Sequence, residues 1–123
     1  MKNEHIIGLL NEYSKRYPLE EVQVKEFKKL ILNSNCFDYD NKIGHITASC
    51  FIIDLSNRYG LLTHHRKINK WLQLGGHINS LDKTIHESAQ REAFEESSLS
   101  SLTLVSEKIF DIDIHKIYNK DLS

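Results

Sequence analysis

Three glutamates in the second half of the sequence are spaced so that they could bind a cation together. Glu92, Glu95 and Glu96 stand at i, i+3 and i+4 in a stretch without Gly or Pro, so a helix places all three carboxylates on one face. Ile85 and Ala89 flank Glu92 on the helical wheel, which makes this the core-facing side. Glu95 and Glu96 fall in the last turn, where the helix dipole disfavours anions by about 0.3–1 kcal/mol each. A bound cation would explain the cluster, and a solvated acidic face is the alternative.

The cation that suits these ligands is Mg²⁺ or Mn²⁺. Hard divalent cations take oxygen ligands, keep several waters and share the rest of their coordination shell with substrate phosphates. Such a cation neutralises charge that develops during attack of water on a phosphoryl group, and it lowers the pKa of the attacking water. The three glutamates therefore predict metal-assisted phosphoryl chemistry.

The sequence around the glutamates resembles the signature of the Nudix hydrolases, G-x5-E-x7-R-E-U-x-E-E-x-G-U, where U is a bulky apolar residue. The match is REAFEESSL at 91–99, preceded by Gly75-Gly76. The stretches HITASCFII and LLTHHRKINKWLQLGGHI are similar to the strands and turn that lead into this signature in one branch of the superfamily. The resemblance covers roughly residues 43–118.

The resemblance implies Mg²⁺- or Mn²⁺-dependent hydrolysis of a pyrophosphate bond in a nucleoside diphosphate linked to a group X. It also implies an α/β fold, an α/β/α sandwich with a mixed sheet. The runner-up interpretation is a catalytically weak Nudix-like domain that binds a nucleotide or a protein partner. The site residues that the resemblance implies are Glu92, Glu95 and Glu96 as metal ligands, Glu92 also as the base, Arg91 holding the glutamates, the Gly75 carbonyl as a further ligand, and Gly76 for the close turn.

The chain departs from the signature at several positions. Lys83 stands where the first Glu is expected, and His77 stands where the first Gly is expected, so the loop carries one extra residue. Ser98 replaces the final Gly, at a helix end that favours a left-handed residue. Either Lys83 folds toward the carboxylates and weakens metal binding, or Asp82 takes the place of the missing acid. An acid is favoured at a helix start, which favours Asp82.

Basic and aromatic residues just before Gly75-Gly76 are candidates for substrate contacts. Arg66 and Lys70 could meet a polyphosphate, or they could belong to a solvated loop. His77 follows the glycines directly and could touch phosphate. Trp71 could stack on a base, but its apolar neighbours favour a place in the core.

The elements that must position these residues follow from hydrophobic periodicity. Pro18 separates two amphipathic segments, and the run from Lys83 or Thr84 to Ser98 is a third. The stretch 45–55 is apolar on both alternations, as in a buried strand. The expected elements are helices at 4–16, 19–32 and 83–98, strands at 45–55, 59–63, 102–105 and 109–117, and a short apolar segment at 71–74 that Gly75-Gly76 stops.

We therefore expect one domain over residues 1–123, with a helical part at 1–35 and the sheet and signature helix at 43–118. Only 24 residues follow Leu99, which is short for the family, so we expect a truncated form or cover from a partner subunit in a homodimer.

The composition argues against several classes of function. The 123 residues are 40% hydrophobic and 27% charged, with a formal net charge of −1, which argues against broad nucleic-acid binding. No apolar run is long enough to cross a bilayer, and the first residues do not resemble a secretory signal. Cys36 and Cys50 form no recognisable motif, and a cytoplasmic setting is expected. A small-molecule nucleotide-type substrate is the expected partner.

Overall fold

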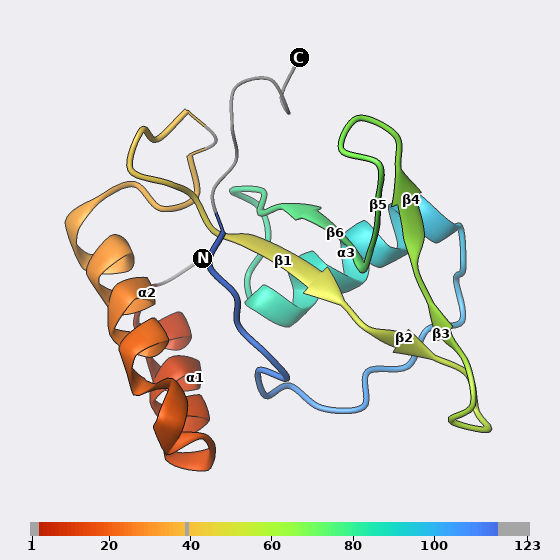
Figure 1. Cartoon of the computed structure of the whole chain (residues 1–123), viewed down its shortest axis with the longest axis horizontal. Helices are drawn as coiled ribbons and strands as arrows, with labels where there is room; N and C mark the ends of the chain where they lie inside the picture. The colour runs from red at the N-terminus through yellow and green to blue at the C-terminus, as the bar shows by residue number, and fades with distance from the viewer. Residues whose placement is uncertain (1–2, 39, 116–123) are drawn as a thin grey trace.

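The computed structural model describes residues 3–38 and 40–115 (Figure 1). Two helices come first, followed by a series of short strands and a third helix. In order along the chain these are α1 (Asn3–Arg16), the 3₁₀ turn η1 (Pro18–Glu20), α2 (Glu21–Asn33), β1 (Thr47–Cys50), β2 (Ile52–Ile53), β3 (Gly60–Leu61), β4 (Thr63–His65), β5 (Lys70–Leu72), β6 (Leu74–His77) and α3 (Ile85–Ser97). The three predicted helices are confirmed to within about two residues at each end.

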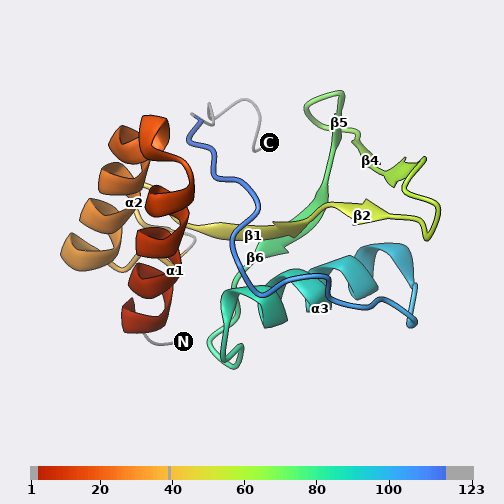
Figure 2. The ribbon, with the colours of Figure 1, turned by 90° about the horizontal axis from the view of Figure 1, so that it is seen from below.

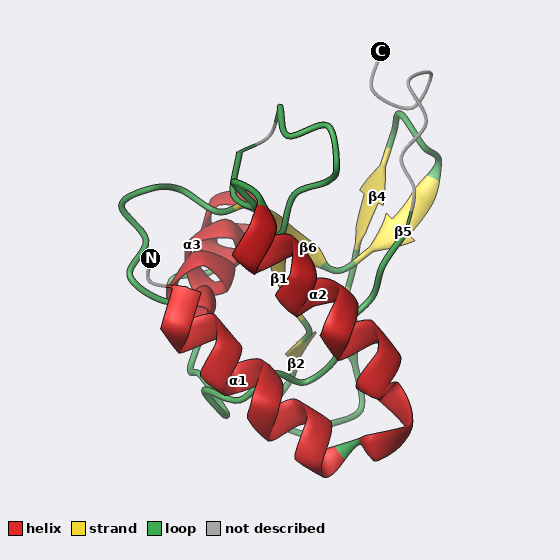
Figure 3. Cartoon of the chain, turned by 90° about the vertical axis from the view of Figure 1, so that its left-hand side faces the viewer, coloured by secondary structure: helices red, strands yellow, loops and turns green. Residues whose placement is uncertain are grey.

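The helices α1 and α2 form an antiparallel hairpin (Figure 3). Pro18 stands at the first position of η1, where its missing N–H costs nothing, and it ends the α1 periodicity. The buried faces are apolar: Ile6, Leu10 and Tyr13 from α1, and Val24 and Ile31 from α2. This packing is the one that the hydrophobic spacing predicts.

The strands form three antiparallel pairs, β1 with β6, β2 with β3, and β4 with β5. In the first pair, Ala48 lies opposite Gly76, and Ser49 lies opposite Gly75. Helix α3 packs along β1 and β6, and the α1–α2 hairpin stands at one end of this pair (Figure 2). One core joins these parts, because a single buried cluster includes Leu10 of α1, Ile31 of α2, Ala48 of β1 and Ala89 of α3.

Two strand predictions need correction. The stretch 45–55 is not one buried strand: it divides into β1 and β2 at Phe51, and Phe51 and Ile53 are exposed. Gly75 and Gly76 do not stop a segment but lie inside β6, paired with β1. Glycine lacks a Cβ, so it allows the two strands to approach closely here. This role outweighs its weak propensity for strands.

The strands predicted at 102–105 and 109–117 are absent from the described residues up to 115, and residues 116 and 117 lie outside the described part. Side chains and one carbonyl hold this segment in place of a ladder. Asp111 Oδ1 accepts a hydrogen bond from the Tyr13 hydroxyl at 3.3 Å, and the Ile109 carbonyl accepts one from Arg16 Nη2 at 2.5 Å. Phe110 stacks on Phe51. Among the residues described up to 115, this segment is thus held by single contacts and joins no ladder.

The molecule thus combines helices with small antiparallel sheets. Every pairing among residues 3–38 and 40–115 is antiparallel, which differs from the expected mixed sheet. Within these same residues, no helix has the length and apolar character needed to span a bilayer.

Candidate functional site

The helix that carries the glutamates has a defined cap at each end. Thr84 precedes α3, and its hydroxyl accepts a hydrogen bond from the Glu87 backbone N–H at 3.1 Å. Ser98 follows the helix in the left-handed conformation, with φ of 61°, and its N–H donates to the Phe94 carbonyl. These caps fix where the helix begins and ends, and so where its glutamates lie.

Glu92 faces the sheet, as its place on the wheel predicts. Its side chain is only 15% exposed. A Cβ on Gly76 would lie 2.8 Å from Glu92 Oε2 and 2.9 Å from Cδ, closer than real atoms approach. The Glu92 carboxylate therefore lies directly over the backbone of β6, and only glycine at 76 leaves room for it.

Gly75 is constrained from the neighbouring strand. A Cβ at this position would lie 2.3 Å from Ser49 Cβ and 2.4 Å from the Ala48 carbonyl oxygen. The Gly-Gly pair thus serves two contacts, one with β1 and one with Glu92.

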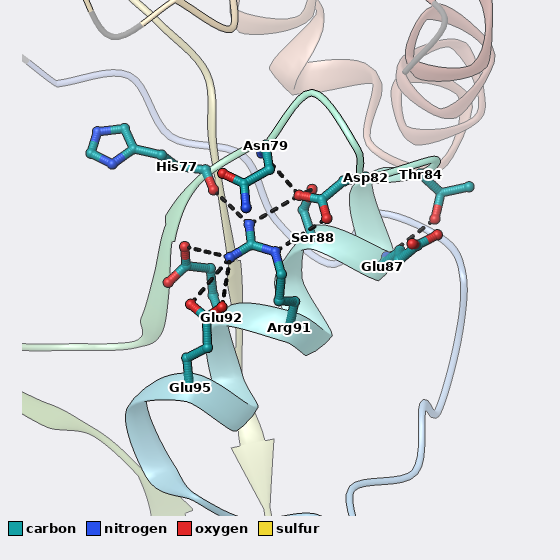
Figure 4. A network of polar contacts seen from close by, with 9 residues as sticks. All are labelled: His77, Asn79, Asp82, Thr84, Glu87, Ser88, Arg91, Glu92 and Glu95. Atoms are coloured by element: carbon teal, nitrogen blue, oxygen red, sulfur yellow. Dashed lines mark hydrogen bonds and ion pairs between the residues drawn. The ribbon is translucent and has the colours of Figure 1, made fainter.

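Arg91 is the centre of the polar network around the glutamates (Figure 4). Its Nη1 donates to Glu92 Oε1 at 3.1 Å and to the two carboxylate oxygens of Glu95 at 3.3 and 3.2 Å. Its Nη2 donates to the His77 carbonyl at 2.9 Å. Arg91 therefore contacts two of the three glutamates, as the family resemblance implies, and joins them to the end of β6.

Asp82 anchors Arg91 from the other side. Arg91 donates from Nε to Oδ1 at 3.1 Å and from Nη2 to Oδ2 at 2.9 Å, and Oδ2 also accepts from Ser88 Oγ at 2.6 Å and from the Asn79 N–H at 2.9 Å. Asp82 is 5% exposed. The Arg91 hydrogen bond outweighs burial and, with those from Ser88 and Asn79, lowers the pKa of Asp82 to about 2.

Asp82 and Lys83, the two residues before Thr84, differ in their surroundings. Lys83 is exposed, whereas Asp82 is buried against Arg91. Asp82 therefore lies at the head of α3 beside Arg91, and Lys83 does not take that place.

The two remaining glutamates differ in surroundings. The Glu95 side chain is 53% exposed, and its charge is partly balanced by Arg91. Partial desolvation raises the pKa of Glu96, and the nearby charges of Glu92 and Glu95 raise it further, while the Gly75 backbone and His65 lower it. Glu96 therefore lies close to both Glu92 and Gly75. The negative charges of Glu92 and Glu95 are among its surroundings.

The donor set suits a hard divalent cation in chemistry, since it consists of carboxylate oxygens on one helix face. The side chains do not converge, however: among residues 3–38 and 40–115, no three His, Cys, Asp or Glu side chains are arranged so that they could hold a metal ion. Glu92 and Glu95 are both turned toward Arg91 instead.

The predicted substrate residues are separated by the fold. Arg66 lines a groove that also includes Glu96. Lys70 lies opposite His65 in the β4–β5 ladder and does not line that groove. His77 lies at the other end of β6, where its ring stacks on His45 with ring centroids 5.2 Å apart.

The sequence favours a place in the core for Trp71, and this prediction is wrong. Trp71 is 67% exposed. It lies on the β4–β5 hairpin, where it packs against His64. Its apolar neighbour Leu72 is also exposed at 36%, so the local apolar run does not reflect burial.

Sequence reasoning missed two contributors to the Arg91 network, Ser88 and Asn79. Neither has a sequence signal, because the path of the loop before α3 brings Asp82 to Asn79 and to Ser88 on the helix. The cap at Thr84, in contrast, has a sequence signal. Thr-x-x-Glu at 84–87 is the pattern of a capping box.

Comparisons of the chain with family models, with curated proteins and with solved structures found no match.

Proposed function

We propose that this protein hydrolyses a pyrophosphate bond in a nucleoside diphosphate linked to a group X, with Mg²⁺ or Mn²⁺ bound by Glu92, Glu95 and Glu96. The observation that carries the proposal is the position of Glu92 over Gly76, beside Glu96 and under Arg91. In this position, the first glutamate of the Arg-Glu-x-x-Glu-Glu pattern contacts a glycine of β6. The proposed fold is the Nudix-like α/β/α sandwich, and the proposed setting is cytoplasmic, which agrees with two free cysteines.

The metal would supply charge neutralisation at the phosphates and acidify a bound water. Glu92 would accept the proton of the attacking water, since Arg91 binds its carboxylate and Gly76 leaves the space that it occupies over β6. Glu95 and Glu96 would contribute oxygen ligands, and the Gly75 carbonyl would add another.

Arg91 can keep its place while a glutamate moves. Its contacts with Asp82 and with the His77 carbonyl do not involve Glu95. Glu95 is more than half exposed, so its side chain can leave Arg91 for a cation without unpacking the helix. Arg91 would then act as a positioning residue for Glu92.

The test is a panel of nucleoside diphosphate derivatives incubated with Mg²⁺ or Mn²⁺ and assayed for the two expected products, a nucleoside monophosphate and the phosphorylated group X. Glu92→Gln should lower kcat by about 100-fold or more, as expected for loss of a general base. Glu87→Gln is the matched control, because Glu87 lies on the same helix with an exposed side chain. Activity that survives Glu92→Gln would contradict the proposal.

A second candidate function has its own supporting observation. Glu92 and Glu95 are both engaged by Arg91, and no three acidic or metal-ligating side chains converge in residues 3–38 and 40–115. This arrangement favours a catalytically weak Nudix-like domain that binds a nucleotide or a protein partner. Calorimetry that detects nucleotide binding, in samples that release no product over hours, would favour this function over hydrolysis.

A further inference from the structure

The β4–β5 hairpin stands apart from the rest of the molecule. Its two strands contact each other more than they contact any other element, and Figures 1 and 3 both show the hairpin projecting away from α1 and α2. Trp71, the only tryptophan in the sequence, lies on this hairpin and is largely exposed. The hairpin therefore presents a large aromatic surface that residues 3–38 and 40–115 leave mostly uncovered.

Trp71 forms a two-ring surface with His64, which we call the ring platform. The two residues lie opposite each other in the β4–β5 ladder, so their side chains leave the same face of the hairpin. Their ring centroids are 5.0 Å apart. Asn69 Oδ1 lies 2.9 Å from His64 Nε2, so a residue of the turn holds the histidine ring. The platform is thus already formed in the free protein, which lowers the cost of binding a ligand there.

The sequence around the ring platform is basic. No Asp or Glu occurs between Asp54 and Asp82, although the whole chain has a formal net charge of −1. Three exposed basic residues lie in the turn between β4 and β5 or directly beside it, and we call them the turn cations: Arg66, Lys67 and Lys70. The aromatic surface is therefore bordered by positive charge.

The carboxylates of α3 lie toward the other face of the hairpin. His65 follows His64 in the strand, so its side chain leaves the opposite face. Burial raises the pKa of Glu96 and the charge of His65 opposes this, which places Glu96 near His65. The groove that includes Glu96 is lined by His64 but not by Trp71. An anionic ligand can therefore lie on Trp71 without meeting Glu96.

A single strand of nucleic acid has both of the groups that this surface can bind. Its bases stack on aromatic rings, largely whatever their sequence, and its phosphates bind arginine and lysine. Arg66 is two residues past His64, about 7 Å along the chain at ~3.3 Å per residue, so the phosphates beside a stacked base would lie near the turn.

We propose that the ring platform and the turn cations bind single-stranded nucleic acid, with one base stacked on Trp71 and its phosphates on the turn. The inference does not rest on the proposed function, because it uses neither a metal ion nor the glutamates of α3.

Other polyanionic surfaces match the hairpin less well. A segment that enters a membrane buries its apolar side chains, whereas this turn reads Arg-Lys-Ile-Asn and is followed by Lys70. A nucleic-acid duplex keeps its bases stacked inside and offers no free base to Trp71.

The experiment measures binding of a labelled oligothymidylate with a 5′-hydroxyl end, in EDTA, by fluorescence anisotropy at several salt concentrations. The fluorescence of Trp71 provides a second readout, since no other tryptophan contributes to it. The variants are Trp71→Ala, Trp71→Phe, and Arg66→Ala with Lys67→Ala. The control is Lys29→Ala with Lys42→Ala, which removes the same charge from exposed positions outside the hairpin. Thermal melts establish that each variant folds.

The parent should bind the strand with quenching of Trp71 fluorescence. Trp71→Ala should bind at least about fivefold more weakly, as expected for the loss of one stacked base, and Trp71→Phe should stay within about threefold of the parent. Arg66→Ala with Lys67→Ala should weaken binding and reduce the slope of log affinity against log salt by about 1.4, or ~0.7 for each lost phosphate contact. The control should keep the slope of the parent.

Several results would overturn the inference. If the parent does not bind the strand, or if Trp71→Ala binds it as tightly as the parent, the ring platform is not a base-binding surface. Equal weakening in both double variants would show general charge attraction. A duplex that binds as tightly as the single strand would exclude base stacking. Vesicles of phosphatidylserine and phosphatidylcholine that change Trp71 fluorescence, when the strand does not, would make the hairpin a membrane-binding surface instead.

Discussion

Arg91 binds the Asp82 carboxylate through two parallel hydrogen bonds, from Nε to Oδ1 at 3.1 Å and from Nη2 to Oδ2 at 2.9 Å. This paired geometry fixes the plane of the guanidinium as well as its position. The third nitrogen, Nη1, is thereby aimed at Glu92 and Glu95. The loop before α3 thus controls the orientation of groups on the helix one to three turns further on.

The Asp82→Asn variant should lose about 2–3 kcal/mol of unfolding free energy at pH 7. The variant leaves Arg91 partly buried without its anchoring charge. Urea denaturation measures the loss, and Asp113→Asn, an exposed carboxylate, is the control.

The same pair predicts a pH dependence. The pKa of Asp82 is about 2 when folded, against an ordinary value of 3.8, so its contribution to stability is full above about pH 4 and is lost as the pH falls toward 2. The parent should therefore lose stability more steeply than Asp82→Asn over that window. Parallel acid curves would show that the ion pair contributes nothing.

The helix carrying the site could be predicted from sequence because its signals are local. Thr84 at the start, the uninterrupted run to Ser98 and the one-face spacing of the glutamates all depend on neighbouring residues. The orientation of Glu92 toward the sheet was predictable for the same reason, from Ile85 and Ala89 on the wheel.

The parts that sequence did not predict depend on contacts between distant residues. Gly75 and Gly76 signal a turn by type, but the close approach of Ser49 and Glu92 makes them strand residues. Phe110 lies in an alternating pattern that suggests a strand, but it stacks on Phe51, about sixty residues earlier. Such contacts leave no periodic signal in either segment.

Glu95→Gln and Glu96→Gln should each lower activity without lowering stability. Both should lower metal-dependent hydrolysis. The folded-state pKa of Glu96 is raised, so its ionised form opposes folding, and this penalty grows as the pH rises above 4.5. Glu96→Gln should thus leave the melting temperature at pH 7 unchanged or higher, whereas Glu95→Gln loses a half-exposed contact with Arg91 and should change it little.

Thermal melts without metal decide this, with Glu26→Gln on α2 as an exposed control. Clear destabilisation by both site variants would mean that the glutamates are structural.

Ser98→Gly should stabilise the protein. Ser98 closes α3 in the left-handed conformation, with φ of 61°, which costs roughly 1 kcal/mol for a residue with a Cβ. Glycine removes this cost but gains chain entropy when unfolded, so a net increase of about 0.5 kcal/mol is expected. Ser100→Gly, outside the cap, should lower stability or leave it unchanged. Denaturant curves that show the same shift for both variants would contradict a role for the cap.

Lys83→Glu should have little effect on metal binding. Lys83 is exposed, and the neighbouring Asp82 already occupies the position beside Arg91. Calorimetric titration with Mn²⁺ should give affinities within about twofold of the parent, with Lys83→Gln as the neutral control. A tenfold rise, equivalent to about 1.4 kcal/mol, would mean that the lysine reaches the glutamates and opposes the cation.

Three glycine variants test whether the approach of Glu92 to β6 matters for activity. Gly76→Ala places a Cβ 2.8 Å from the end of the Glu92 side chain, which can rotate away, so the stability cost should be about 1 kcal/mol or less. Gly75→Ala meets backbone and Cβ atoms of β1 at 2.3–2.5 Å that cannot move aside, and should cost about 1–3 kcal/mol or more. Gly8→Ala, in α1 with open space around it, should stabilise by about 0.5–1 kcal/mol.

Activity should follow a different order from stability. Gly76→Ala displaces the carboxylate of the proposed base, and a misplacement of about 1 Å can cost up to roughly 100-fold in rate, so its kcat should fall well below that of the parent while the protein stays folded. Gly8→Ala should match the parent in kcat. If Gly76→Ala is folded and as active as the parent, then the contact between Glu92 and Gly76 does not position the base, and the observation on which the proposed function depends would be incidental packing.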